Sequence, residues 1–324
     1  MSFTNIDEIL DYAISREQKA AAFYAHLATR GSEKDRFKTG LTGYHGRPVE
    51  VAMRQVSFFA LLVIVGVLAF AADRPEGRSF ATRSVTYARN GMVAAAHPLA
   101  VEIGLDVLKA GGSAVDAAIA TNAALGFMEP VSNGLGGDLF AMVWDPASGK
   151  LYGLNASGRA PAALTIDKVP PDEDGTIPTY TPYSWTVPGC ADGWFELHDR
   201  FGRLPMKDIL GPVASVAREG APVPQVIAGA WVRGADRFKD KPGFAEVFMP
   251  DGKIPSEGDV FANPALARTL EMMVEGGRDA FYRGKIAEEI VAFSDEVGGF
   301  FSIEDFANHS SEWIEPISTT YRGL

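Results

Sequence analysis

The sequence is short of the residues that many functional sites require. Cys190 is the only cysteine in 324 residues, which excludes an intrachain disulfide and a metal site built on cysteine. The five histidines are scattered without the spacing of zinc ligands, so we expect no metal and no other cofactor. The net charge is −11 and no stretch is rich in lysine or arginine, which argues against a nucleic-acid partner.

Two common signatures are also missing. No G-x-S-x-G elbow of a serine hydrolase occurs, because the segment GGSAV around Ser113 lacks the closing glycine. The glycine-rich segment SNGLGGD at 132–138 follows a helix-like stretch and precedes a strand-like one, the reverse of a dinucleotide site. We interpret it as a tight turn in which backbone approaches backbone. His97, before Pro98, is interpreted as a turn residue, and His198 as a packing or surface residue.

One apolar run indicates a cellular location. Residues 58–72 (FFALLVIVGVLAFAA) follow Met53 and Arg54 and end in a small-x-small pattern. The run is short for a membrane-spanning helix, which needs ~20 residues, and it has the three parts of a secretory signal peptide. The alternative is a helix or strand buried on all sides. We expect a periplasmic or secreted protein that starts naturally at Met53, although 52 residues precede this methionine.

Beyond this run, the chain has the composition of a globular protein, with 47% hydrophobic and 22% charged residues. Residues 98–109 are expected to form a helix with Val101, Leu105 and Leu108 on one stripe. Ser113 is expected to cap an alanine-rich, deeply buried helix. The other expected elements, in chain order, are a buried strand at 91–96, the capped helix at 113–128, a hairpin of strands 139–144 and 151–155, helices starting near 190 and 208, a loop-rich stretch at 222–260, helices at 263–275 and 282–293, a helix capped by Ser302, and a strand beginning at about 317.

The first residues differ in character from the rest. Residues 1–30 follow helical spacing, and the stretch resembles the first helix of a rubrerythrin-like, ferritin-fold protein, with Glu17 and Tyr24 at matching positions. A di-iron site takes carboxylates from four helices, so we interpret Glu17 as a solvated residue of a helix fragment. The expected domains are this fragment at 1–30, a linker at 31–52, the signal-like segment at 53–72, and one large domain at 73–324.

Six blocks of sequence stand out in the large domain. They are GMVAAAHPLAVEIGLDVLKAGGSAVDAAIATNAALGFMEPVSNGLGGDLFAMVWD (91–145), NASGRAP (155–161), VPGCADGWFELHDRFGRLP (187–205), NPALARTLEMMVEGGRDAFYRGKIAEEIV (263–291), GGFFSIEDFANHSSEW (298–313) and TTYRG (319–323). In their order and spacing, these blocks resemble the gamma-glutamyltransferase (glutathione hydrolase) proenzymes. The resemblance implies an α+β fold, the large-subunit portion of the four-layer αββα architecture of N-terminal-nucleophile hydrolases.

The resemblance also implies a mechanism. In such enzymes a precursor cuts itself, and the freed threonine at the head of the small subunit attacks the substrate amide with its own α-amine as base. That threonine lies beyond the TTYRG block, and neither Thr319 nor Thr320 matches the cleavage motif. We therefore expect no catalytic residue in this chain and no activity without the missing small-subunit half. The incomplete sheet should leave an unpaired edge and an exposed apolar face, so the isolated chain should aggregate or be degraded.

One departure from the family pattern concerns specificity. Gamma-glutamyl-specific members carry Arg-Glu-x-Ala-Pro where this chain has Ser157, Gly158, Arg159, Ala160 and Pro161. The family arginine clamps the substrate's α-carboxylate, which a serine cannot do. Arg159 is the candidate substrate-binding residue; alternatively it is a structural arginine that braces the end of the hairpin.

Three functions remain open on the sequence. The first is hydrolysis or transfer of a γ-glutamyl group from a small substrate such as glutathione to water or an amine. The second is an acylase or amidohydrolase of the same family that acts on another small amide. The third is a non-catalytic fusion fragment.

Overall fold

The computed structural model describes residues 86–170 and 175–320. The expected helix fragment at 1–30, linker at 31–52 and signal-like segment at 53–72 lie outside these ranges. Within them, no helix is long and apolar enough to cross a membrane. The helices are α3 (Pro98–Lys109), α4 (Ala114–Met128), α5 (Cys190–Phe201), α6 (Met206–Glu219), α7 (Gln225–Phe238), α8 (Phe244–Phe248), α9 (Pro264–Tyr282), α10 (Lys285–Glu296) and α11 (Ile303–Ala307). The strands are β1 (Leu139–Asp145), β2 (Lys150–Ala156), β3 (Ala221–Pro222), β4 (Val260–Phe261) and β5 (Glu312–Ile314).

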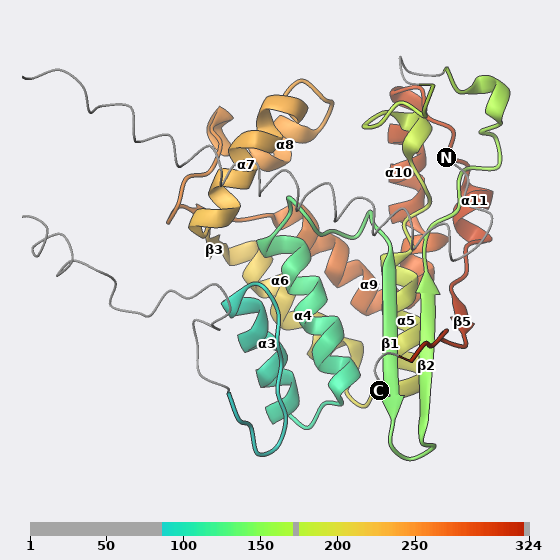
Figure 1. Ribbon diagram of the computed structural model, residues 1–324. Helices are drawn as coiled ribbons and strands as arrows, with labels where there is room; N and C mark the ends of the chain where they lie inside the picture. Colours follow the sequence, from blue (N-terminus) through green and yellow to red (C-terminus); the bar gives the residue numbers. More distant parts are fainter. Residues whose placement is uncertain (1–85, 171–174, 321–324) are drawn as a thin grey trace, which may run out of the picture. The chain divides into compact units, whose positions relative to one another are not determined.

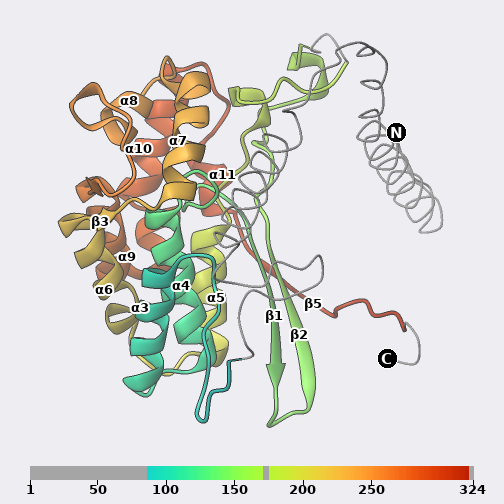
Figure 2. The same cartoon turned by 60° about the vertical axis from the view of Figure 1, so that its left-hand side comes forward.

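The principal sheet is small and antiparallel, in the order β1-β2-β5. β1 and β2 form the expected hairpin, in register from Leu139 opposite Ala156 to Asp145 opposite Lys150. Gly149 has φ 65° in the turn, a conformation that favours glycine. β5 returns from the far end of the sequence to pair with β2. Figures 1 and 2 show the long hairpin standing beside a layer of helices.

The helical layer is built on close approach between small residues. In α3 the buried residues are Ala100, Gly104 and Val107. A Cβ at Gly104 would lie 2.2 Å from Thr121 Oγ1 of α4, so only glycine allows this approach. The expected helix 98–109 is therefore confirmed, and its buried residues lie one position before the expected stripe. Val101, Leu105 and Leu108 are only half-buried.

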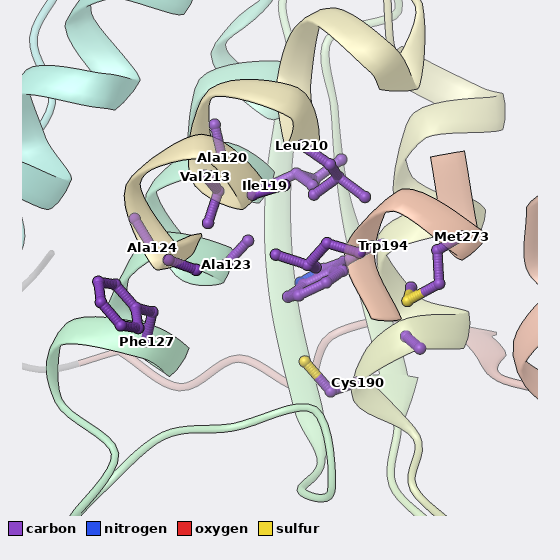
Figure 3. Close-up of a cluster of buried hydrophobic side chains, with 14 of the residues drawn as sticks. Ile119, Ala120, Ala123, Ala124, Phe127, Cys190, Trp194, Leu210, Val213 and Met273 are labelled. Carbon is purple, nitrogen blue, oxygen red and sulfur yellow. The ribbon is translucent and has the colours of Figure 1, made fainter. Parts of the chain in front are cut away.

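Helix α4 lies at the centre of the core, as its alanine content predicts. Ser113 and Asp116 form a reciprocal capping box at its start. The Asp116 carboxylate also accepts hydrogen bonds from the backbone N–H groups of Arg203 and Leu204, which fix the loop between α5 and α6. Figure 3 shows side chains of α4 meeting those of α5, α6 and α9 around Trp194, which is 3% exposed.

The expected strand at 91–96 is wrong. These residues have no strand pairing, and all are exposed except the half-buried Val93. Met92 is 53% exposed. A strand needs a neighbour for its N–H and C=O groups, and the described part of the chain provides none for this segment.

The stretch at 222–260, expected to be rich in loops, contains two helices that were not expected, α7 and α8. The prolines of this stretch lie outside α7, although Gly229 and Gly234 lie within it, and Ile227, Trp231 and Ala235 are buried at helical spacing.

Further along, α9 is interrupted by a non-helical residue, Gly277 (φ 63°), close to the helix end expected at 275. The next helix after this break reaches Tyr282, and α10 starts at Lys285 instead of at Tyr282 as expected. We expected a strand beginning at about 317, but the last strand in the described ranges is β5, and residues 315–320 form no strand. Residues 321–324 lie outside the described ranges.

Candidate functional site

The site begins where β2 ends and the segment Ser157–Gly158–Arg159 turns away from the sheet. Gly158 N donates to Asp138 Oδ1 at 2.7 Å, which ties the end of β2 to the start of β1. A Cβ at Gly158 would lie 1.9 Å from Val187 O, so this position requires glycine. Val187 N donates in turn to Arg159 O at 3.0 Å. The backbone of the candidate segment is therefore held from both sides.

The glycine-rich loop at 132–138 packs against the start of α5. Gly137 O accepts hydrogen bonds from Gly189 N at 3.1 Å and Cys190 N at 2.9 Å, so it satisfies amides that the helix leaves unpaired. A Cβ at Gly189 would lie 2.1 Å from Ala156 O. Within the loop, Gly137 N donates to Gly134 O at 3.2 Å, which closes a turn as expected. None of its glycines has a positive φ, however, and a Cβ at Gly134 or Gly136 would meet nothing within 4 Å, so the expected need for glycine is not seen there.

A cavity of about 450 Å³ lies between this loop and the helices, and we call it the Gly-loop cavity. Asn122 Oδ1 accepts a hydrogen bond from Trp194 Nε1 at 2.8 Å and lies 3.6 Å from Cys190 Sγ. Burial, reinforced by Asp138, raises the pKa of the Cys190 thiol to about 12, so the thiol stays protonated and is not a nucleophile. The lining residues are Asn122, Ala123, Gly126, Pro130, Val131, Ser132, Asn133, Gly134, Leu135, Gly136, Gly137, Asp138, Cys190, Trp194, Leu266 and Leu270.

Arg159, the candidate substrate-binding residue, lies outside the lining of this cavity. Its Nη2 atom donates to Glu312 Oε1 at 2.7 Å, which joins the end of β2 to β5. The two side chains are 61% and 58% exposed, so the guanidinium remains accessible to a ligand. An exposed pair of this kind stabilises a fold by about 0–1 kcal/mol. Both interpretations of Arg159 therefore stand.

A buried polar cluster around Asp192 was not predicted from the sequence. Asp192, in the first turn of α5, is 1% exposed. Its carboxylate accepts hydrogen bonds from Arg278 Nε of α9 and from both N and Oγ of Ser311. Arg278 Nη2 also donates to His309 O at 2.5 Å. Because these partners lie 86 and 119 residues from Asp192, no local motif could have revealed them. The cluster anchors the segment that leads into β5.

His309 packs against this cluster as a buried ring whose nitrogens form no hydrogen bond. Its ring stacks on Tyr282, with centroids 5.2 Å apart, and its Nε2 is 3.8 Å from Asp192 Oδ2. Neither ring nitrogen has a hydrogen-bond partner. Burial lowers the pKa of His309 from 6.5, against the weaker opposing effect of Asp192, which favours the neutral ring.

The other histidines take structural roles where they are described. His97 caps α3 by accepting a hydrogen bond from Leu99 N, as expected for a turn residue. His198 Nε2 lies 2.7 Å from Leu204 O and is half-buried, in agreement with a packing role. In the described ranges, no group of three or more His, Cys, Asp or Glu side chains is placed to hold a metal ion.

The fold is the large-subunit portion of an N-terminal-nucleophile hydrolase, an α+β arrangement with helices on one side of an antiparallel sheet. Solved structures support this class. The chain is 43% identical to a cephalosporin acylase from Bacillus halodurans, with a TM-score of 0.71, covering 78% of this chain and 48% of that one. It is 28% identical to the Helicobacter pylori gamma-glutamyltranspeptidase, with a TM-score of 0.69, covering 74% of this chain and 70% of that one.

Sequence comparison identifies the family. The gamma-glutamyltranspeptidase profile matches residues 100–324. The chain is 33% identical over 273 residues to the glutathione hydrolase proenzyme of Bacillus subtilis (strain 168), covering 82% of this chain and 46% of that protein. The chain therefore belongs to the gamma-glutamyltranspeptidase family, and it spans about half the length of the curated relative it matches.

Proposed function

We propose that this chain is the large-subunit part of an amide hydrolase or transferase that moves a γ-glutamyl group from a small substrate such as glutathione to water or an amine. The carrying observation is the held segment at the end of β2. The backbone at Gly158 and Arg159, which align with the family's substrate-binding motif, is held by hydrogen bonds to Asp138 and Val187. The guanidinium of Arg159 remains accessible. A guanidinium there suits a substrate carboxylate, which it can bind bidentately.

The proposal includes a second half that supplies the nucleophile. β1 is an edge strand of the sheet as described, and its outward side chains Phe140, Met142 and Trp144 are 68%, 70% and 61% exposed. An unpaired edge beside an apolar face is the surface that a further sheet would cover. We propose that the small-subunit half of the family fold occupies it.

A second candidate function is an acylase acting on an amide without the γ-glutamyl α-amine. The 43% identity to a cephalosporin acylase favours it. Ser157 replaces an arginine that binds the α-carboxylate, a group that both acyl chains carry, so it does not decide between the two candidates. The two candidates share their amide chemistry and differ only in what they require of the acyl group.

The test supplies the missing half and compares two matched substrates. The chain is co-expressed with the small-subunit half of the Bacillus halodurans acylase, and kcat/KM is measured for γ-glutamyl-p-nitroanilide and glutaryl-p-nitroanilide. These differ only by the α-amino group. Preference for the first supports the γ-glutamyl proposal, and preference for the second supports the acylase. Hydrolysis of neither by a purified complex of the two halves would contradict both.

Two variants resolve the role of Arg159. If it binds the substrate carboxylate, Arg159→Ala should raise KM about tenfold or more, the loss of a charge-assisted hydrogen bond. Glu312→Gln breaks the same ion pair but keeps the guanidinium, so it should leave KM unchanged or lower it. Equal effects of the two variants would assign Arg159 to bracing β2 against β5.

We also propose that the protein acts outside the cytoplasm. The support is the signal-like segment at 53–72, which lies outside the described residues. Cell fractionation, with and without that segment, tests the proposal. If the protein is found only in the cytoplasm both with and without the segment, the proposal is wrong.

A further inference from the structure

A second cavity, of about 640 Å³, lies on α7 and α8, and we call it the α7–α8 cavity. Its volume is in the range of small-molecule sites, roughly 300–1,000 Å³. Figures 1 and 2 show α7 and α8 on the helical side of the molecule, away from the hairpin. The lining residues are Pro130, Val131, Ser132, Tyr180, Ala230, Trp231, Arg233, Gly234, Arg237, Phe238, Phe244 and Phe248.

The wall of this cavity is a set of mutually packed aromatic rings. Tyr180 meets Phe238 edge-on at 5.2 Å, Phe244 lies 5.9 Å from Phe238 and 5.3 Å from Phe248, and Trp231 lies 6.2 Å from Phe248. Trp231 Nε1 donates to Phe248 O at 3.1 Å, so the polar atom of the indole is already satisfied. The wall therefore offers apolar surface without requiring rearrangement.

The charges that line this cavity have one sign. Arg233 and Arg237 are its only lining residues with a charged side chain, in a protein of net charge −11. Within the described part of the chain neither guanidinium forms an ion pair. The acidic residues on the same helices, such as Asp236 and Glu246, do not line the cavity. Guanidinium groups that have no acidic partner and lie beside an apolar wall favour a ligand that carries a carboxylate on an apolar body.

Tyr180 is held in place at some conformational cost. Its φ is 60°, in the left-handed region that residues other than glycine rarely adopt. Arg237 Nη1 donates to the Tyr180 hydroxyl at 2.8 Å, and its guanidinium carbon lies 4.7 Å from the ring centroid. Strained residues that their surroundings hold in place gather at ligand sites. This arrangement fixes one wall of the cavity and orients Arg237 toward it.

We propose that the α7–α8 cavity binds a small amphipathic carboxylate, with its apolar body against the aromatic wall and its carboxylate at Arg233 and Arg237. The inference goes beyond amide hydrolysis, because it needs neither the nucleophile nor a second half. Pro130, Val131 and Ser132 line both this cavity and the Gly-loop cavity. A ligand bound here therefore contacts the loop that the candidate site is built on.

The test measures binding of 4-phenylbutanoate and 4-phenylbutanamide to the full chain by equilibrium dialysis. These probes share an apolar body and differ in charge. We expect the carboxylate to bind about tenfold more tightly, as loss of charge-assisted hydrogen bonds costs about that factor. The Arg233→Gln/Arg237→Gln variant should lose the difference and keep the wild-type circular dichroism spectrum. Arg268→Gln, at an exposed arginine of α9, should keep the difference.

Three results would overturn the proposal. The first is equal affinity for the two probes, or binding of neither, in the wild-type chain. The second is an equal loss in Arg268→Gln, which would mean that overall charge governs binding. The third is loss of binding in Trp144→Ser, which would place the probe on the open face of the sheet.

Discussion

The two faces of strand β1 differ in burial: one packs against the core and the other is exposed. Leu139, Ala141 and Val143 point inward and pack against the core. Phe140, Met142 and Trp144 alternate with them and are more than half exposed. A strand with one face in water carries polar residues on that face, whereas a strand covered on both sides is apolar throughout. The sequence of β1 is therefore that of a strand buried on both faces, and the described residues cover one of them.

The largest contrast should appear when similar side chains are removed from the two faces. Leu154 of β2, opposite Ala141, is 2% exposed, whereas Met142 is 70% exposed. Leu154→Ala should lower the free energy of unfolding by about 2–5 kcal/mol, through lost burial and a residual cavity. Met142→Ala should change it by about 0.5 kcal/mol or less. Urea unfolding of both variants measures the difference.

Equal losses in the two variants would break the comparison. They would mean that the outer face is covered in solution, either by another copy of the chain or by a partner that copurifies. Sedimentation velocity on the same samples identifies which of the two is present.

A smaller effect is expected on self-association. The double variant Phe140→Thr/Trp144→Thr removes two large apolar side chains from the open face and replaces them with β-branched residues, which are suited to a strand. Burial of one such side chain stabilises an interface by about 1.5–3 kcal/mol, so association should weaken about tenfold or more. Sedimentation velocity over a concentration series measures this.

The matched control is Ile166→Thr, at an apolar side chain that is 84% exposed but lies outside the sheet. It should associate as the wild-type chain does. If the double variant associates as strongly as the control, the open face does not drive association, and the proposed docking surface for the second half loses its support.

The same comparison shows where sequence reasoning succeeds. Local signals sufficed for the capping box at Ser113, the cap at Ser302, the hairpin and the alanine-rich helix, because each depends on neighbours within a few residues. The open apolar face and the unpaired edge of the sheet were also predicted, from the family resemblance. That the isolated chain aggregates stays a prediction.

Sequence reasoning failed where distant contacts decide the structure. The segment 91–96 is apolar enough for a strand but has no partner among the described strands. Helix α7 was missed because it contains Gly229 and Gly234 and is flanked by prolines, which obscured the helical spacing of Trp231 and its buried neighbours. The cluster at Asp192 joins residues from α5, α9 and the approach to β5, so only the folded chain brings it together. The motif pointed to Arg159 as a candidate substrate-binding residue, but it gave no sign that Glu312 would be its ion-pair partner.

The smallest predicted effect is a loss of stability in acid that arises from the buried His309. Burial lowers the pKa of His309 below its ordinary 6.5, whereas the unfolded chain takes up a proton near that value. Between the two pKa values the unfolded state binds more protons, so the free energy of unfolding falls as the pH drops below about 6.5. The loss is about 1.4 kcal/mol for each unit by which the two pKa values differ.

His309→Phe should flatten this dependence. Neither ring nitrogen of His309 has a hydrogen-bond partner, so the phenyl ring loses no hydrogen bond and can keep the stack on Tyr282. Stability at pH 7.5 should change by no more than about 1 kcal/mol, since replacing an unsatisfied buried polar group by an apolar one is nearly neutral or favourable. A residual slope should remain from His97, whose pKa burial also lowers. Urea unfolding at pH 5.0 to 7.5 measures both slopes, and an unchanged slope in His309→Phe would show that the acid sensitivity arises elsewhere.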